Sequence, residues 1–423
     1  MDQQMDNQLP EGWVFSEVNH LIEFQNGFAF KSSDYREVGD FVIRIGNVQD
    51  GEIILSNPAY IDAYDLNAEG FLLNVGDILI SLTGNIGRVA IIQKHHLPAV
   101  LNQRVARLKT SNVNSKFVFY LMRSHNVQSQ IMKSAKGAAQ LNISTKDIGK
   151  ITIPLPPLAE QHYLADKLDS LLARIQTVSE QLAAVPALLK QFRQSVLADA
   201  VSGKLTAEWR NKNELSISNY QEISQQEKQD KLDKRKIKTA SLPHEFAPSI
   251  TLPESWRWLS LDEACYKITD GTHHSPKSYA TGDFMYVTSK NVREGYLDLS
   301  NITYVDKATH QEIFSRCNVA YQDVLYIKDG VNTGLSCVNT IEEEISLLSS
   351  VAVFKPCSFL HPFYLQHYLN SPVGRQVMLD LMGGTAIKRL TLQKIINSPI
   401  PIPPLTEQTE IVRRVEALFA LAD

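Results

Sequence analysis

The sequence predicts two mixed α/β domains in tandem, separated by a long helix with a coiled-coil pattern. Two observations lead to this prediction. Short motifs of the first half return in the second half at a nearly constant offset of about 245 residues, beginning with LPEGW at Leu9–Trp13 and LPESW at Leu252–Trp256. Between the copies, apolar residues recur at alternating spacings of four and three, which is typical of a helix with one continuous apolar stripe.

Three further motifs return at the same offset. They are NVQDG at Asn47–Gly51 and NVREG at Asn291–Gly295, VGDILIS at Val75–Ser81 and YQDVLYI at Tyr321–Ile327, and PLPPLAEQ at Pro154–Gln161 and PIPPLTEQ at Pro401–Gln408. This period is too long for a solenoid and suits a domain with its spacer. We therefore expect residues 1–153 and 251–400 to be domains of one fold, with Leu9–Ile153 superposing on Leu252–Ile400.

Each copy reads as the same series of elements. After LPExW come short β-branched runs punctuated by Gly and Asn, which predict strands; in the first copy they are Phe41–Ile45, Gly51–Leu55 and Asp77–Leu82. A helical segment near Lys116–Lys136, with its counterpart at Pro362–Leu381, precedes a glycine-rich loop and a short strand. The pattern predicts a mixed domain of about 150 residues, present twice.

The proline-rich octet ends each domain. Proline fixes its own φ and disfavours helix in the residue before it, so PLPP predicts a stiff, extended end to a strand. The glutamate that follows then lies in the first turn of a helix, where the helix dipole favours a carboxylate. A proline-rich ligand for a partner domain is the alternative, but a helical pattern follows at once in both copies. We expect the first elbow, together with the spacer helix that follows it, at residues 154–210. We expect the second elbow, together with the start of a further helix, at residues 401–423.

The helix after the first elbow has the strongest pattern in the chain. Its predicted extent is Glu160–Val201, ending near Ser202-Gly203 because glycine terminates helices, and Pro186 should kink or split it. After the second elbow the pattern restarts and the sequence ends at Asp423, so we expect a truncated sequence with about 30 further helical residues to follow. We refer to the apolar stripe as the seam. Its residues are Leu164, Leu168, Leu171, Ile175, Val178, Leu182, Val185, Leu189, Phe192 and Val196, then Ile411, Val415 and Leu418 after the second elbow.

Residues 211–250 are polar and include the basic run KLDKRKIK at Lys231–Lys238, which we interpret as part of a solvated linker. The chain has 43% hydrophobic residues and no apolar run of the roughly 20 residues that span a bilayer. The polar, acidic N-terminus is unlike a signal peptide, and the four cysteines have neither disulfide nor zinc spacing. We expect a cytoplasmic protein with reduced thiols and no metal.

The net charge of −4 hides a strong asymmetry. Residues 1–83 hold 3 Lys and Arg against 14 Asp and Glu, whereas residues 84–150 hold 11 Lys and Arg against Asp147 alone. A basic segment of this kind attracts a polyanion such as nucleic acid. A basic face that docks on an acidic protein is the alternative.

Motifs of catalysis are weak or incomplete. Asn57-Pro58-Ala59-Tyr60 resembles the Asn-Pro-Pro-Tyr motif of DNA amino-methyltransferases, but alanine replaces a proline and no cofactor loop precedes it. The segment Ser202–Thr206 lacks the glycines and the ending of a phosphate loop. The pairs His95-His96 and His273-His274 have no ligand partners at metal spacing. The sequence predicts a binding protein without catalytic residues.

The duplicated LPExW domain, the PxPPLxEQ elbow, FRQSVLADAVSGKLTAEWR at Phe192–Arg210 and EIVRRVEALFALAD at Glu410–Asp423 resemble the DNA-specificity subunit of type I restriction-modification systems. The resemblance implies two target-recognition domains held apart by coiled-coil helices in a pseudo-two-fold dumbbell, each reading half of a bipartite DNA target. It also implies modification subunits that bind S-adenosylmethionine and methylate adenine, and restriction subunits that use ATP and Mg to translocate and cut. The chain itself binds no cofactor in this interpretation.

Three loops keep their place in the repeat but differ in sequence, so they are candidates for reading an asymmetric target. The first loop is Phe28–Tyr35 or Thr272–Tyr279, the second is Leu82–Arg88 or Lys328–Gly334, and the third is Lys136–Asn142 or Gly383–Arg389. Arg and Lys suit guanine, Asn and Gln suit adenine, and hydroxyls suit phosphate. The candidates are Lys31, Ser32, Thr83, Asn85, Arg88, Arg104, Lys136, Gln140 and Asn142, with His273, His274, Lys277, Lys328, Asn332, Thr333, Thr385, Lys388 and Arg389 in the second copy. The alternative function is a scaffold or decoy that binds the other subunits and reads no DNA.

Overall fold

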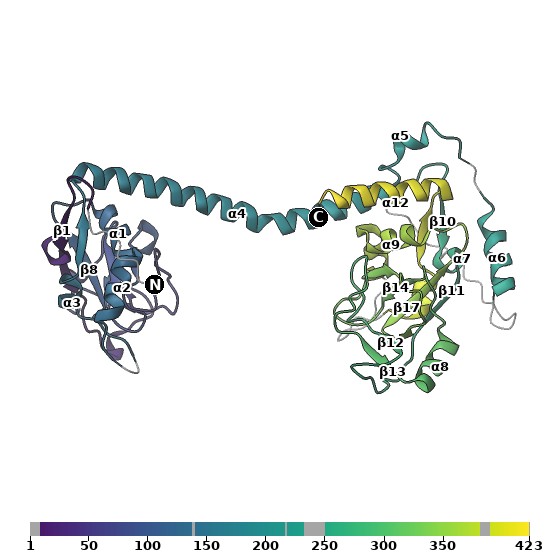
Figure 1. Ribbon diagram of the computed structural model, residues 1–423, viewed down its shortest axis with the longest axis horizontal. Helices are drawn as coiled ribbons and strands as arrows, with labels where there is room; N and C mark the ends of the chain where they lie inside the picture. The colour runs from purple at the N-terminus through teal and green to yellow at the C-terminus, as the bar shows by residue number, and fades with distance from the viewer. Residues whose placement is uncertain (1–8, 138–139, 216–217, 232–249, 381–389, 423) are drawn as a thin grey trace. The chain divides into compact units, whose positions relative to one another are not determined.

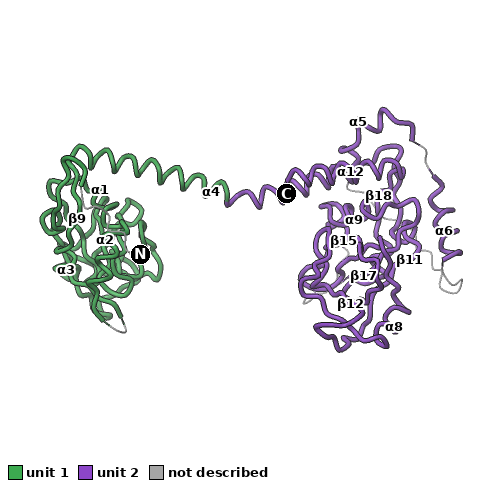
Figure 2. Tube along the Cα trace, viewed as in Figure 1, with its two compact units in different colours: residues 1–182 green, residues 183–423 purple. Residues whose placement is uncertain are grey.

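The structure is a computed structural model that describes residues 9–137, 140–215, 218–231, 250–380 and 390–422. The chain divides into two compact units, residues 1–182 and 183–423 (Figure 2). Each unit has its own sheets and its own hydrophobic cores.

Unit 1 is built from helices, a four-stranded sheet and a three-stranded sheet (Figure 1). The larger sheet has the order β2 (Ile22–Asn26), β8 (Val105–Thr110), β5 (Ile78–Ser81) and β6 (Val89–Ile91); the smaller has β4 (Tyr60–Ile61), β3 (Asp40–Ile43) and β7 (Ala99–Leu101). Side chains alternate along β5, so Ile78 and Ile80 share a core with α1 (Ser115–Arg123) and α2 (His125–Ser134). Leu79 points the other way and packs with the smaller sheet.

Unit 2 repeats this arrangement. Its larger sheet has the order β11 (Cys265–Asp270), β17 (Val351–Pro356), β14 (Val324–Ile327) and β15 (Ser336–Val338); its smaller sheet has β13 (Thr303–Val305), β12 (Phe284–Val287) and β16 (Ser346–Leu347). Tyr326 shares a core with α9 (Pro362–Asn370) and α10 (Pro372–Asp380), whereas Leu325 packs with the smaller sheet. The short helices are α3 (Thr145–Gly149) in unit 1, and α7 (Leu261–Ala264), α8 (Lys307–Arg316) and α11 (Leu392–Ile396) in unit 2.

A two-stranded sheet closes each domain. In unit 1, β1 (Val14–Glu17) pairs with β9 (Thr152–Leu155), and in unit 2, β10 (Arg257–Ser260) pairs with β18 (Pro399–Ile402). Every strand pairing of the first copy thus recurs in the second, in the same order along the chain. The prediction of two tandem mixed α/β domains is confirmed.

Three expected elements differ. Gly51–Leu55 is not a strand, because the Asn47 side chain donates to the carbonyls of Ile54 and Ser56 and holds the segment in a turn. The expected helices near Lys116–Lys136 and Pro362–Leu381 are each two helices. The first breaks at Ser124, whose hydroxyl accepts from Val127 N–H and begins α2; the second breaks at Ser371, just before a proline.

The predicted helix between the domains is confirmed as α4 (Leu158–Ser202). Pro186 lies inside α4 and does not split it, contrary to one of the two expectations. Gly203 follows in the left-handed region (φ +79°), as a helix terminator does. A Cβ at this position would lie 2.6 Å from Pro253 Cγ, so the close approach also requires glycine.

In unit 2 the end of α4 packs against α12 (Leu405–Ala420), which runs in the opposite direction (Figure 1). Val196 shares a core with Ile411 and Val415. The middle of the α4 seam is exposed, from Leu171 through Val185. Within the described residues, no helix is both long and apolar enough to cross a lipid bilayer.

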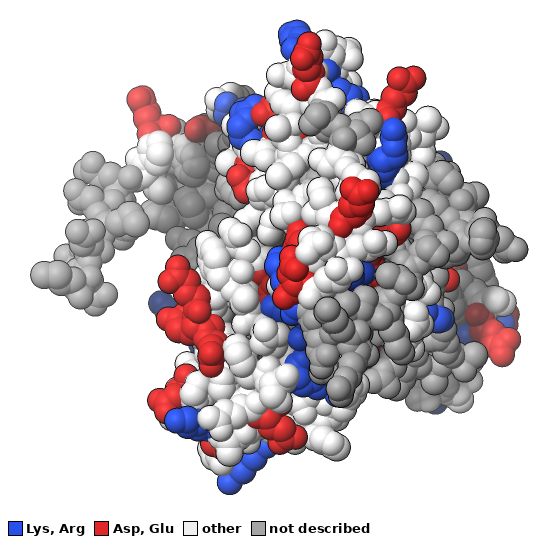
Figure 3. Space-filling model, turned by 90° about the vertical axis from the view of Figure 1, so that its right-hand side faces the viewer, with Lys and Arg blue, Asp and Glu red and all other residues white. Residues whose placement is uncertain are grey.

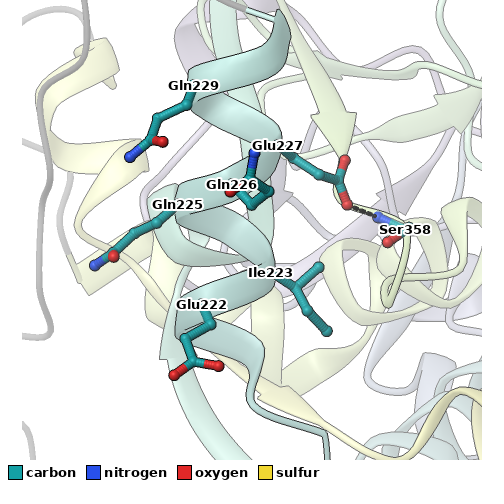
Figure 4. A pocket seen from close by; sticks show the side chains of 7 residues that line it. All are labelled: Glu222, Ile223, Gln225, Gln226, Glu227, Gln229 and Ser358. Atoms are coloured by element: carbon teal, nitrogen blue, oxygen red, sulfur yellow. Dashed lines mark hydrogen bonds between the residues drawn. The ribbon is translucent and has the colours of Figure 1, made fainter.

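Part of the expected solvated linker is folded. After α5 (Ala207–Arg210), helix α6 (Tyr220–Lys231) packs on β11 and α7 of unit 2. Lys228 is buried and donates to Asp262 (2.7 Å), and Glu227 accepts from the Ser358 N–H (2.8 Å). Figure 4 shows Glu227 turned toward Ser358, whereas Gln225 and Gln229 project from the opposite side of α6. Most of the basic run Lys231–Lys238 lies outside the described residues.

Candidate nucleic-acid interface

The tryptophan of LPExW and the glutamate of the octet contact each other in both units. In unit 1 the Trp13 indole N–H donates to Glu160 Oε2 (3.0 Å), and in unit 2 the Trp256 indole N–H donates to Glu407 Oε2 (2.9 Å). The glutamate was expected only to complement the helix dipole. In the structure it ties the start of a helix to the start of its domain, which explains why both motifs are repeated.

The glutamine after this glutamate has a fixed role as well. Gln161 and Gln408 are buried, and each donates from its amide to a proline carbonyl of its own octet (2.9 and 2.8 Å). Each also accepts a backbone N–H from the residue before a domain helix, Asn114 for α1 (3.0 Å) and His361 for α9 (2.7 Å). The octet therefore fixes the direction in which the helix leaves the domain.

In unit 2 further side chains join the contact between the tryptophan and the glutamate. The Glu407 carboxylate is fully buried and accepts from Thr206 Oγ1 (2.6 Å) and from Arg210 Nε (2.9 Å) and Nη2 (2.8 Å). Arg210 also donates to the Gly203 carbonyl and lies over the Trp256 ring. The motif SGKLTAEWR thus closes over the second elbow and holds α4, α5 and α12 together.

The remaining repeated motifs also build the framework. Asn47 accepts from the Arg44 N–H (3.0 Å) and donates to a carbonyl across its turn, and Asn291 makes the same two contacts in unit 2. The aspartate before the third strand of each larger sheet pairs with a buried cation on the adjacent strand. These pairs are Asp77 with Arg107 (2.9 Å) and Asp323 with Lys355 (2.5 Å).

The loops that differ between the copies meet at one end of the larger sheet. In unit 1 the first loop joins the end of β7 and the turn that leads to β8: the Phe28 N–H donates to the Leu101 carbonyl (2.9 Å), and the Gln103 N–H donates to the Phe28 carbonyl (2.9 Å). The approach is so close that a Cβ on Gly27 would lie 2.2 Å from the Asn102 carbonyl oxygen. Only glycine fits this position.

The second and third loops join the same end of unit 1. The Leu82 N–H donates to the Arg104 carbonyl (3.0 Å), on the other side of the turn that binds the first loop. The Gly84 N–H donates to the Leu141 carbonyl (2.8 Å), which attaches the third loop to the second. Backbone hydrogen bonds therefore bring the three loops together in unit 1, which the sequence did not predict.

Unit 2 joins its loops by equivalent bonds. The Thr272 N–H donates to the Leu347 carbonyl (2.9 Å) and the Lys328 N–H to the Ser350 carbonyl (2.9 Å). The Leu390 N–H, directly after the third loop, donates to the Lys328 carbonyl (3.2 Å), as the Ile143 N–H donates to the Leu82 carbonyl (3.0 Å) in unit 1. We refer to the described loops of this set in a unit, with the turn that joins them, as its loop cluster; the third loop of unit 2 lies outside the described residues.

A buried aspartate binds three basic side chains in and beside the loop cluster of unit 2. Asp270 is buried at the end of β11 and binds Arg316 Nη2 (2.9 Å), Lys328 Nζ (3.4 Å) and His273 Nε2 (3.5 Å). Lys328 was expected at the surface, but only 3% of the residue is exposed because two aspartates, Asp270 and Asp329, hold its ammonium. Its place is inside the cluster rather than on its surface.

The other candidates within the described residues lie at the surface or partly exposed. Arg316 was not predicted, because α8 has no counterpart α-helix among the described residues of unit 1 to reveal it. Half of its side chain is exposed, beside the first loop. The exposed candidates are Lys31, Ser32, Asn85, Arg104, Lys136, Gln140, Asn142, His273, His274, Lys277 and Asn332, and the half-buried ones are Thr83, Arg88 and Thr333. Thr385, Lys388 and Arg389 lie outside the described residues.

The basic segment of unit 1 is partly neutralised by the fold. Three of its cations pair with acids from outside the segment: Arg107 with Asp77, Arg123 with Asp50 and Lys116 with Asp169. Figure 3 faces unit 2, where basic and acidic side chains are likewise interspersed among the residues drawn in blue, red or white. The positive charge available to a polyanion is therefore smaller than the sequence count indicates.

One cluster has the arrangement of a catalytic site and does not support catalysis. His310 Nδ1 lies 3.0 Å from Ser346 Oγ, and Nε2 lies 3.0 Å from Glu344 Oε2, which is the connectivity of a hydrolytic triad. Ser346 is fully buried, so no substrate reaches its hydroxyl. Within the described ranges, no three His, Cys, Asp or Glu side chains gather closely enough to hold a metal ion.

The comparison with known families decides what this architecture is. The family model of the type I restriction modification DNA specificity domain matches residues 10–187 and 253–423, which is most of both copies. The chain belongs to this family of specificity subunits. The resemblance seen in the repeated motifs is confirmed.

Relatives of this specificity subunit match along nearly its whole length. The EcoBI specificity subunit of Escherichia coli is 28% identical over 98% of this chain and 81% of its own. The EcoKI specificity subunit of Escherichia coli strain K12 is 26% identical over 98% of this chain and 84% of its own.

Solved structures share the fold. The HsdS subunit from Thermoanaerobacter tengcongensis superposes with a TM-score of 0.58 at 17% identity, over 98% of this chain and 91% of that chain. A chain from a structural study of complex assembly and conformational transition of the type I restriction-modification system also gives a TM-score of 0.58, at 18% identity, over 99% and 92%.

Proposed function

We propose that this specificity subunit reads a bipartite DNA target, one half with the loop cluster of each unit. The observation that carries the proposal is the meeting of the variable loops at one end of the larger sheet: all three loops in unit 1, and in unit 2 the first two loops with Leu390, the residue that follows the third. Loops on a rigid scaffold are the usual place for recognition. Because the two clusters differ in sequence, the two half-sites differ as well.

The side chains of the clusters divide by chemistry. In unit 1 the guanidinium of Arg88 is held by Gln49, which orients it, whereas Arg104 and Lys136 are exposed. We assign Arg88 to a base edge, where a fixed guanidinium suits guanine, and Lys136 to the phosphate backbone. In unit 2 the exposed part of Arg316 serves a phosphate, and buried Lys328 positions the cluster by binding Asp270.

Helix α4 serves as spacer and as docking surface for two modification subunits in this proposal. A helix of 45 residues is about 68 Å long at roughly 1.5 Å per residue. Its apolar seam is exposed at Ile175 (60%), Val178 (52%) and Leu182 (64%). An apolar stripe of this kind is stabilised by covering it with another helix, at about 25 cal/mol per Å².

The chemistry then belongs to the partners. Modification subunits supply S-adenosylmethionine and methylate adenine, and restriction subunits supply ATP-driven translocation and cleavage with Mg. This chain contributes the choice of sequence. No residue of the loop clusters is assigned a catalytic role.

The test is selection from random DNA with the assembled complex of specificity and modification subunits, followed by sequencing of the bound and methylated molecules. Two short motifs at a constant gap support the proposal. A pool without sequence preference, from a complex that assembles normally, would instead support a scaffold or decoy that binds the other subunits.

A further inference from the structure

The tip of the second loop in unit 2 carries an unexplained apolar side chain. Val331 has a relative exposure of 104%, the highest of the large hydrophobic residues in the described part of the chain. It lies in the hairpin loop between β14 and β15, in the loop cluster of unit 2. Its neighbours Asn332 and Thr333 were considered for DNA contact, but Val331 was not.

The loop around Val331 is ordered by its own hydrogen bonds. The Gly334 N–H donates to the Ile327 carbonyl (2.9 Å) and closes the hairpin, and the Thr333 hydroxyl donates to the Gly330 carbonyl (2.6 Å). Gly330 and Gly334 have positive φ angles, +106° and +102°. Turn residues are normally Gly, Asn, Asp or Ser, so the turn gains nothing from valine at its tip.

Nothing in the described domain covers this tip. A Cβ built on Gly330 or Gly334 meets no described atom within 4 Å. In unit 1, by contrast, a Cβ on Gly84 would lie 3.4 Å from Gln140 of the third loop. The valine is therefore presented outwards, on a short β-branched side chain that loses little rotamer freedom when it is fixed by a ligand.

The equivalent tip of unit 1 has the opposite chemistry. Asn85 follows Gly84, a glycine with φ +72°, in the same hairpin loop, and its side chain is exposed. The framework is shared, and the side chain at the tip changes from an amide to an isopropyl group. An amide suits adenine in the major groove.

We propose that Val331 is a specificity-determining residue of unit 2 that contacts the C5 methyl group of a thymine in the major groove. The proposal rests on the proposed function, because it places the loop cluster of unit 2 on DNA. Among the groups on major-groove base edges, the thymine methyl is the apolar one. The aspartate beside the tip, Asp329, is paired with Lys328 and does not repel the DNA backbone.

The test replaces each thymine of the half-site read by unit 2 with deoxyuridine, which removes only the C5 methyl group. The assembled complex is titrated with each DNA, as wild type and as Val331→Ala. Burying one methyl group is worth about a fourfold change in affinity. We expect one deoxyuridine to weaken wild-type binding by about fourfold, and Val331→Ala to bind thymine DNA about as weakly and to be indifferent to that deoxyuridine.

Val38→Ala is the matched control, because Val38 is also exposed (78%) but lies in unit 1 outside its three loops. It should leave both DNAs unchanged. The proposal is overturned if no deoxyuridine in the half-site weakens binding, if Val331→Ala keeps the full sensitivity to deoxyuridine, or if the half-site contains no A·T pair. In those cases sequence-specific binding persists and the proposed function stands; loss of all sequence preference in the wild-type complex would overturn both.

Discussion

Replacing Glu407 with glutamine should release the second elbow. The carboxylate is fully buried and accepts from Thr206, from two nitrogens of Arg210 and from the Trp256 indole. In Glu407→Gln, the amide oxygen can accept from Thr206 and Arg210, which bind Oε1, while the NH₂ group takes the place of Oε2 and faces the Trp256 indole N–H; Arg210 also loses its charged partner. Leaving a partly buried guanidinium without its carboxylate costs about 3 kcal/mol, the lower end for buried pairs, because the Arg210 side chain is 16% exposed and keeps its bond to the Gly203 carbonyl.

The first elbow provides the matched comparison. Glu160 accepts only the Trp13 indole N–H among the described residues, so Glu160→Gln loses about one neutral-donor hydrogen bond, about 1 kcal/mol. Glu208→Gln changes an exposed glutamate of α5 itself and serves as the control.

The assay is hydrogen exchange of the amides in residues 203–210 and 405–415. A change of about 3 kcal/mol raises their opening equilibrium by about 150-fold, whereas Glu160→Gln and Glu208→Gln should leave these amides unchanged. Equal exchange in Glu407→Gln and in the control would refute the reasoning, because the buried carboxylate would then hold nothing.

Three further predictions concern DNA and pH. Arg88→Ala should reduce the discrimination between bases at one position of the target by about 1–3 kcal/mol. Lys136→Ala should weaken binding to all DNA sequences alike and lower the slope of log affinity against log salt concentration by about one. Unchanged DNA binding in both variants would contradict the loop assignment. Deleting the heptad Leu171–Thr177 shortens α4 by about 10 Å and keeps the apolar seam on one face of the helix. The preferred gap between the two half-sites should therefore fall by about three base pairs. An unchanged gap in a mutant that still methylates DNA would mean that the length of α4 does not set the gap. Burial lowers the pKa of His367 to about 4. As the pH falls, the unfolded state, in which the histidine has its ordinary pKa of about 6.5, binds the proton before the folded state does. The free energy of unfolding of unit 2 should therefore fall by about 2 kcal/mol between pH 7 and pH 5. In His367→Gln the pH slope over this range should be shallower by up to one proton, and an identical slope would contradict the assignment.

The repeated motifs predicted the duplication and the place of the helix, because both depend on spacing along the chain. They did not predict what the repeated residues do. The contact between Trp13 and Glu160 joins residues 147 positions apart, so no local rule for helix starts could reveal it. A tryptophan and a glutamate that recur together at the two ends of each domain were the available signal.

The exposure of the predicted loop residues could not be read from the sequence, for a related reason. Whether a lysine in a glycine-rich loop faces solvent depends on residues elsewhere in the sequence, and Lys328 is buried by Asp270 from another strand. The strand expected at Gly51–Leu55 has suitable β-branched residues, but Asn47 uses the carbonyl of Ile54 for a turn. Arg316 lies on a helix that the repeat could not point to.

The central claim is that the two loop clusters read separate halves of one target. The most direct measurement exchanges the second loop of unit 1, residues 82–88, for that of a relative with a different target and sequences the DNA methylated by the assembled complex. The account predicts a bipartite motif in which one half changes while the other half and the gap between them stay the same. A pool in which both halves change together, or in which neither half changes while methylation persists, would contradict it.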